Sequence, residues 1–113
     1  MGFNLIEENG YKYIEEGEGF PIIILHGLMG NLSNFNEVTN FFKNKNCKVI
    51  MPVLPIYDLP ILKTSVKELA KFVDKFILHK KIKDFVLMGN SLGGHIGLYY
   101  TKIFNKAKGL VLT

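Results

Sequence analysis

Ser91 lies in the segment Gly89-Asn90-Ser91-Leu92-Gly93, which has a glycine two positions to either side of the serine. The four apolar residues 85–88 before it predict a buried strand, and the amphipathic segment after it predicts a helix. A strand, Gly-x-Ser-x-Gly and a helix in this order are the setting of a nucleophile elbow, a turn that projects the serine hydroxyl from the carboxyl edge of a sheet. We therefore predict that Ser91 is the nucleophile of an acyl-transfer reaction, and that Gly89 and Gly93 let the strand and the helix approach closely.

A second motif, His26-Gly27-Leu28-Met29-Gly30, also follows an apolar β-branched run and precedes a predicted helix. A serine that attacks a carbonyl creates a tetrahedral oxyanion, and two preorganised backbone N–H groups are needed to stabilise it. One donor is predicted to be the amide of Leu92, directly after the serine. The other is predicted to be the amide of Leu28, with Met29 as the alternative.

The histidines are predicted to be structural. His26 is expected to stabilise the oxyanion loop by hydrogen bonding, and Gly27 and Gly30 to support the same loop. His95 follows Ser91 by one helical turn; the alternative role, a catalytic base, requires that its ring reach the hydroxyl in good geometry. His79 lies near a predicted helix end among lysines and is expected at the surface.

The acidic residues near these motifs are also predicted to be structural. Asp58 follows the fourth strand in a proline-containing loop and is expected to cap a turn; the alternative role is a triad acid. Asp84 precedes a strand, at the opposite edge of the sheet. The sequence has no His-x-x-x-His pair and no acidic cluster, so no metal site is predicted. Phosphate-binding glycine motifs are absent as well, and no cofactor is predicted.

The elements that must position these motifs alternate between strand and helix. Asn9-Gly10 predicts a type I′ hairpin between strands at residues 3–7 and 11–15, followed by a break at residues 17–19. Further strands are predicted at residues 21–25, buried on both faces, and at residues 48–54 and 85–88. Residues 109–113 are predicted to begin one more buried strand. This alternation predicts an α/β fold: a mostly parallel sheet with helices on both faces and an N-terminal antiparallel hairpin.

Three helices are predicted from capping signals and apolar spacing. The first runs from a capping box at Asn34 to about Lys45, and the second from a capping box at Ser65 and Glu68 to about His79. The third follows Ser91. The apolar stripes of the first and third helices are predicted to contain Phe35, Val38, Phe41 and Phe42, and Leu92, Ile96, Tyr99, Tyr100 and Ile103.

Length and composition limit the protein class. The 113 residues allow at most one domain, and no apolar run approaches the roughly 18 residues of a membrane span. The N-terminus has no secretory pattern, and Cys47 is the only cysteine, so a cytoplasmic protein without disulfides is expected.

The net charge of +4 comes from lysines alone, because the chain has no arginine. Nucleic-acid binding is therefore not expected, since arginine makes many of the specific contacts to nucleic acids. The densest basic group, Lys80, Lys81 and Lys83, is predicted to be the solvated end of a helix, where cations suit the helix dipole; a binding patch is the alternative.

The two motifs, in this order and spacing, resemble the first half of the α/β-hydrolase fold family, and the resemblance covers essentially all 113 residues. The predicted strands then correspond to the first six strands of that fold, and the chain to the N-terminal portion of a single domain. The elbow is similar to those of serine esterases and carbon–carbon bond hydrolases. Serine at the nucleophile position distinguishes it from the dehalogenase and epoxide-hydrolase branches. The resemblance implies that Ser91 is the nucleophile and that Leu28 and Leu92 form the oxyanion hole.

The family's acid and histidine come later in the chain, in the order Ser…Asp/Glu…His. Residues 1–113 end within the sixth strand, so we expect neither to be present and little turnover from these residues alone. The leading hypothesis is a hydrolase of esters or related acyl compounds, with small-molecule substrates and no membrane partner. The alternatives are a non-catalytic binding module of the same fold and an inactive truncated fragment. The open edge of the sixth strand predicts self-association.

Overall fold

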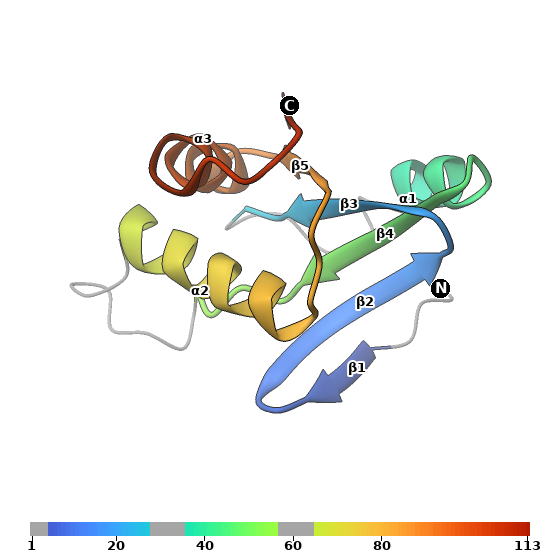
Figure 1. Ribbon diagram of the computed structural model, residues 1–113, viewed down its shortest axis with the longest axis horizontal. Coiled ribbons are helices and arrows are strands. Elements are labelled where there is room, and N and C mark those ends of the chain that lie inside the picture. The colour runs from blue at the N-terminus through green and yellow to red at the C-terminus, as the bar shows by residue number, and fades with distance from the viewer. Residues whose placement is uncertain (1–4, 28–35, 57–64) are drawn as a thin grey trace.

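The computed structural model describes residues 5–27, 36–56 and 65–113 (Figure 1). The predictions for Leu28, Met29, Gly30, Asn34, Phe35 and Asp58 lie outside these ranges. In chain order the described elements are β1 (Leu5–Glu8), β2 (Tyr11–Gly17), β3 (Phe20–Leu25), α1 (Asn36–Lys43), β4 (Cys47–Pro52), α2 (Val66–His79), β5 (Val86–Gly89), α3 (Leu92–Phe104) and β6 (Gly109–Leu112).

The strands form one sheet in the order β1-β2-β4-β3-β5-β6. β1 and β2 are antiparallel, as are β2 and β4, whereas β4, β3, β5 and β6 run parallel. Asn9 and Gly10 have φ values of 50° and 84°, the two positive values that a type I′ hairpin turn requires. The predicted fold class, a mostly parallel sheet with an N-terminal antiparallel hairpin, is therefore confirmed.

Helices cover both faces of the sheet, α1 on one face and α2 with α3 on the other (Figure 1). The alternation of side chains along β3 shows how one strand serves both layers. Ile23 and Leu25 pack in the core beneath α2 and α3, whereas Ile22 and Ile24 pack against α1. The prediction that this strand is buried on both faces is confirmed. Helices therefore pack on both faces of the strand whose carboxyl end leads to the predicted site.

Helix α2 begins as its sequence predicts. The Ser65 hydroxyl oxygen accepts a hydrogen bond from the Glu68 amide at 3.1 Å, so Ser65 is the N-cap. The side chains that the helix buries recur at helical spacing: Leu69, Ala70, Val73, Phe76 and Ile77.

A buried polar bridge joins α2 to α3. The Tyr100 hydroxyl donates a hydrogen bond to Asp74 Oδ1 at 2.9 Å, and Lys106 Nζ lies 2.9 Å from the same oxygen. Burial, and then the hydrogen bond to Asp74 and its charge, raise the pKa of the Tyr100 hydroxyl well above its usual value. The bridge fixes the position of α3, the helix that begins directly after Ser91.

Several details predicted from local sequence patterns are wrong, because packing against distant elements decides which side chains of a helix are buried. Helix α1 buries Thr39 rather than Phe41, which is 57% exposed, because the short helix turns only one narrow stripe to the sheet. In α3 the partly buried residue near the end is Phe104, which packs against the core, whereas Ile103 is 53% exposed.

The strand boundaries also differ from the prediction. β2 extends to Gly17, which the sequence places in a break, because Gly17 still pairs with Lys48 of β4. β4 ends at Pro52, two residues before the predicted end at residue 54. β6, predicted to be buried, is the outer strand of the sheet. Its Val111 and Leu112 are 42% and 48% exposed because β5 is its only neighbour among the described strands.

None of the helices in the described ranges combines the length and the hydrophobicity that a membrane-spanning helix requires.

Candidate active site

Ser91 occupies a sharp turn between β5 and α3. Its backbone has φ 57° and ψ −120°, a conformation that residues with a side chain rarely adopt. The residue is exposed, although strand β5 before it and helix α3 after it both contribute buried residues. The predicted strand–turn–helix context is therefore present, and the turn is strained at the serine itself.

Close backbone approach explains the glycines on either side of Ser91. A Cβ atom on Gly93 would lie 2.0 Å from the Leu25 carbonyl oxygen, and one on Gly89 would lie 2.4 Å from the Gly93 carbonyl oxygen. Contacts this short do not occur, so an alanine at either position would force the start of α3 away from the sheet. The backbone also joins the two strands here, because the Asn90 amide donates to the Leu25 carbonyl at 3.2 Å.

The two sequence motifs meet in space. A Cβ atom on Gly27 would lie 3.0 Å from Ser91 Cβ and 3.3 Å from the Leu92 nitrogen. Since β3 and β5 are parallel neighbours, with Leu25 paired to Gly89, the loop after β3 leaves the sheet beside the elbow. Position 27 therefore needs a glycine, because a side chain there would contact Ser91. The sequence alone did not indicate this contact.

The Leu92 amide is the first backbone donor after Ser91. Helix α3 begins at this residue, and no residue in the described ranges accepts a hydrogen bond from its N–H. The amides of Gly93 and Gly94, in contrast, donate to the carbonyls of Asn90 and Ser91, each at 2.9 Å. The Leu92 N–H is thus one donor next to the Ser91 hydroxyl, at the positive end of a helix dipole.

His26 lies beneath this site and makes two hydrogen bonds. Its Nε2 accepts from the Leu54 amide at 2.9 Å, and its Nδ1 lies 3.2 Å from the Gly27 carbonyl. These partners assign the neutral ring with the proton on Nδ1, which donates to Gly27. Burial lowers the pKa of His26, partly opposed by the bond to Gly27. The ring therefore links the loop after β3 to the segment after β4.

The other two histidines do not reach the serine. His95 is exposed on α3, and within the described residues its ring makes no hydrogen bond to the Ser91 hydroxyl. His79 lies at the end of α2 in a small cluster, with Nε2 2.9 Å from Glu8 Oε1 and its ring stacked on Tyr11. The described ranges thus contain no base positioned to activate Ser91.

One contact near the elbow had no signal in the sequence. The Asn90 side-chain amide donates to the Thr113 hydroxyl oxygen at 3.1 Å, and the Thr113 amide donates to the Gly89 carbonyl at 3.0 Å. These bonds tie the end of β6 to the turn. Among the described residues no group of three His, Cys, Asp or Glu side chains is placed to hold a metal ion.

In the basic group at the end of α2, Lys80 departs from the prediction of a solvated helix end. Lys80 is mostly buried: its Nζ lies 3.0 Å from Glu15 Oε1 and donates to the Tyr13 hydroxyl at 3.0 Å. Burial lowers the pKa of Lys80, but these two hydrogen bonds and the Glu15 charge outweigh it and raise the pKa above its usual value. Lys81 and Lys83, the other two members of the group, are exposed.

Comparison with known proteins defines the family. A family model described as "alpha/beta hydrolase fold" matches residues 21–113. The chain therefore belongs to the α/β-hydrolase fold family, which confirms the resemblance inferred from the sequence.

Individual relatives agree with this assignment. The chain is 30% identical over 95 residues to "Putative esterase/lipase 2" of Mycoplasma genitalium, covering 80% of this chain and 35% of that protein. MGS-MChE2, an alpha/beta hydrolase enzyme from the metagenome of sediments of the Mar Chica lagoon, Morocco, superposes with a TM-score of 0.92 at 47% identity, over 96% of this chain and 50% of the other. Epoxide hydrolase VrEH1 from Vigna radiata superposes with a TM-score of 0.85 over 98% of this chain and 39% of the other; at 20% identity this likeness shows the fold alone. The chain thus spans between a third and a half of the length of these proteins.

Proposed function

We propose that this chain forms the nucleophile half of a serine hydrolase that acts on a carboxylic ester or a related acyl compound, a carbon–carbon bond next to a carbonyl included. The observation that carries the proposal is the exposed, strained Ser91, with Gly27 packed against it and the Leu92 N–H beside it, which has no acceptor among the described residues. The likeness to the esterase/lipase of M. genitalium supports an ester substrate.

In the proposed reaction the Ser91 oxygen attacks the substrate carbonyl and forms a tetrahedral intermediate. The Leu92 N–H donates to the oxyanion, and the second donor is the amide of Leu28, or of Met29, as the sequence predicts. The intermediate collapses to an acyl-serine and expels the alcohol, and water then releases the carboxylic acid. Loss of one oxyanion donor typically costs about 3 kcal/mol of transition-state stabilisation.

Both steps require a base, and the two described histidines nearest the elbow do not provide it. His26 has both ring nitrogens engaged, and His95 makes no hydrogen bond to Ser91. We therefore propose that the acid and the histidine are supplied by sequence after Thr113, in the order that the family uses. Removal of a triad base typically lowers kcat by several orders of magnitude.

The test compares residues 1–113 with a polypeptide that continues through a downstream acid and histidine. p-Nitrophenyl acetate hydrolysis and fluorophosphonate labelling are measured for each. We expect the longer polypeptide to hydrolyse the ester and to be labelled on Ser91, with both lost in Ser91→Ala, and residues 1–113 to show little turnover. Efficient turnover by residues 1–113, abolished by Ser91→Ala, would refute the need for a downstream base.

The second candidate function is a binding module that keeps the fold without catalysis. It is favoured by the lack of any described side chain that activates Ser91. This candidate predicts that the fluorophosphonate leaves Ser91 unlabelled even in the longer polypeptide, while the polypeptide remains folded by circular dichroism. The labelling experiment therefore separates the two candidates.

We also propose that residues 1–113 self-associate through β6. Among the described strands it has a neighbour on one side only, and its Val111 and Leu112 are exposed. An unpaired edge with apolar side chains favours pairing with another chain. Sedimentation velocity should show oligomers that Val111→Lys reduces, whereas Leu98→Lys, at an exposed apolar residue of α3, should leave them unchanged. A monodisperse wild-type monomer would refute the proposal.

A further inference from the structure

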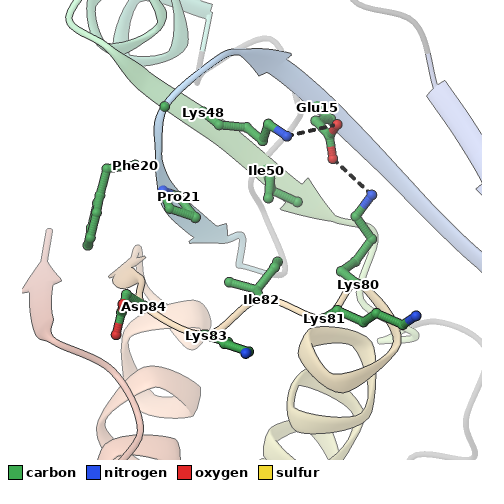
Figure 2. Close-up of a pocket in the computed structure, with 11 residues that line it drawn as sticks. Glu15, Phe20, Pro21, Lys48, Ile50, Lys80, Lys81, Ile82, Lys83 and Asp84 are labelled. Atoms are coloured by element: carbon green, nitrogen blue, oxygen red, sulfur yellow. Dashed lines mark ion pairs between the residues drawn. The ribbon is translucent and has the colours of Figure 1, made fainter.

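A pocket of about 530 Å³ opens at the edge of the sheet opposite Ser91 (Figure 2). It lies at the amino ends of β3 and β5, since its lining includes Phe20 and Pro21 at the start of β3 and Asp84 just before β5. Because these strands are parallel, the elbow lies at their other end. The volume falls within the range of about 300–1,000 Å³ that is typical of small-molecule sites.

One wall of the pocket is apolar. Phe20, Pro21, Ile50 and Ile82 line it, and they come from β3, β4 and the segment that joins α2 to β5 (Figure 2). Phe20 is 41% exposed, although it is one of the larger apolar side chains in the chain. This wall offers a surface for a short hydrocarbon chain or a ring.

The other wall and the rim are basic. Lys48, Lys80, Lys81 and Lys83 line the pocket, against two carboxylates, Glu15 and Asp84. Glu15 is shared by two of the lysines: its Oε2 lies 3.8 Å from Lys48 Nζ and its Oε1 lies 3.0 Å from Lys80 Nζ (Figure 2).

The remaining charges leave an excess of cation at the rim. Asp84 pairs with Lys108, at 3.6 Å, on the side of β6. Within the described ranges Lys81 and Lys83 make no ion pair and no side-chain hydrogen bond. Two lysines next to an apolar wall therefore have no counter-charge among the described residues.

The backbone at Lys81 supplies an independent observation. Helix α2 ends in a Schellman motif, in which the Lys81 amide donates to the Leu78 carbonyl and the Ile82 amide to the Ile77 carbonyl, each at 3.1 Å. Lys81 occupies the left-handed position of this motif, with φ 58°, where glycine is the usual residue. A lysine is thus held at the rim of the pocket in a conformation that favours glycine.

We propose that this pocket binds a small amphiphilic anion, a molecule with a short apolar chain or ring that ends in a carboxylate or a phosphate. The apolar part lies against Phe20, Pro21 and Ile82, and the anionic head is bound by Lys81 and Lys83. This site is separate from the elbow and does not depend on the chemistry proposed for Ser91.

The test is a titration of ¹⁵N-labelled residues 1–113 with octanoate, octyl phosphate, 1-octanol and inorganic phosphate, followed by amide chemical shifts. Both octyl anions should bind saturably and shift the amides of Gly19, Ile82 and Lys83. 1-Octanol and inorganic phosphate should each bind about tenfold more weakly, because each lacks one half of the recognised chemistry. If only octanoate or only octyl phosphate binds, that head group is the ligand class.

Variants locate the binding. Lys81→Gly combined with Lys83→Gln should weaken octanoate binding about tenfold. Lys67→Gln and Lys75→Gln, at exposed lysines of α2, remove the same number of charges and should change it less than about twofold. Lys81→Gly also removes the strain of a left-handed lysine. The variant that combines it with Lys83→Gln should therefore melt at a higher temperature than wild type while binding octanoate more weakly. Loss of binding therefore cannot be attributed to unfolding.

Three results would overturn the proposal. Equal binding of 1-octanol and octanoate would indicate apolar adhesion without a charge site. Equal binding of inorganic phosphate and octyl phosphate would indicate a charged patch without an apolar site. Shifts at Gly27 and Leu92 instead of Gly19 and Ile82 would place the ligand at the elbow.

Discussion

Two residues at opposite edges of the sheet, Ser91 and Lys81, hold conformations that suit glycine, and for different reasons. Among the described residues five non-glycines have positive φ, and the other three are asparagines, which tolerate the left-handed region. Lys81 is accommodated locally, by two hydrogen bonds at the end of its own helix. Ser91 is fixed by long-range packing, because the Gly27, Gly89 and Gly93 backbones leave the turn no space to relax.

The comparison indicates how the fold uses strain. At the α2 terminus Lys81 could be replaced by glycine without disturbing any neighbour. The strain energy of Lys81 is therefore small and does not depend on packing elsewhere. At the elbow three glycines bring two segments into close backbone contact around the exposed, strained serine, so the turn is part of the sheet–helix interface. Strain that persists because the surrounding backbone packing fixes it is typical of a functional site.

The largest expected effect comes from the packing that encloses Ser91. Gly93→Ala places a methyl group 2.0 Å from the Leu25 carbonyl oxygen and should lower the free energy of unfolding by more than about 3 kcal/mol. Gly94→Ala is the matched control, because its nearest neighbours would lie at 3.6 Å, and it should be tolerated. Urea denaturation measures both. Similar stabilities of the two variants would contradict the close approach of α3 to β3.

Relief of the strain at Ser91 should give the next largest effect. Ser91→Gly should raise the free energy of unfolding by about 1–2 kcal/mol relative to Ser91→Ala, which keeps the Cβ atom and therefore the strain. Both variants lack the hydroxyl, so the comparison isolates the backbone. If the glycine variant is no more stable than the alanine variant, the turn is not strained in solution.

The free energy of unfolding should depend on pH through His26, which lies beside the elbow and not at the α2 terminus. The folded state holds His26 neutral with a lowered pKa, mainly through burial, whereas the unfolded chain titrates near 6.5. Below pH 6.5 the unfolded state therefore binds a proton that the folded state does not bind. The free energy of unfolding then falls as the pH is lowered, by at most about 1.4 kcal/mol per pH unit. Above pH 6.5 this contribution is constant.

The control for this pH effect is His26→Asn, which removes the titrating ring and leaves His79 and His95. The difference between the wild-type and variant unfolding free energies should decline from pH 7 to pH 5. A difference that does not change over this interval would show that His26 is accessible to protons in the folded protein.

The smallest expected effect is at Lys81. Lys81→Gly should raise the free energy of unfolding by about 0.5–1 kcal/mol relative to Lys81→Ala, because the left-handed position is relieved without any contact to rebuild. Thermal denaturation of the two variants measures it. If Lys81→Gly raised the free energy of unfolding as much as Ser91→Gly, the two residues would not differ in how their strain is maintained.

Much of the fold and part of the site followed from the sequence. Strand β3, the Asn9-Gly10 hairpin and the Ser65 cap depend on patterns of a few residues, and the structure has all three. The elbow was predictable for the same reason, since its strand, turn and helix are contiguous in the chain. The predictions failed at Phe41 and Ile103, where helical spacing places two apolar residues near the core and only the neighbouring elements decide which is covered.

The sequence by itself determined which residues could form a nucleophile elbow, because a tight turn after a strand needs glycine at fixed positions. Only the tertiary structure decided that Gly27 abuts Ser91, that His26 joins two loops, and that four lysines line one pocket together with Glu15 and an apolar wall. Those arrangements depend on the strand order, which brings together residues distant in the chain. The physical reason is that local patterns fix the backbone conformation of a segment, whereas long-range strand pairing fixes which segments become neighbours.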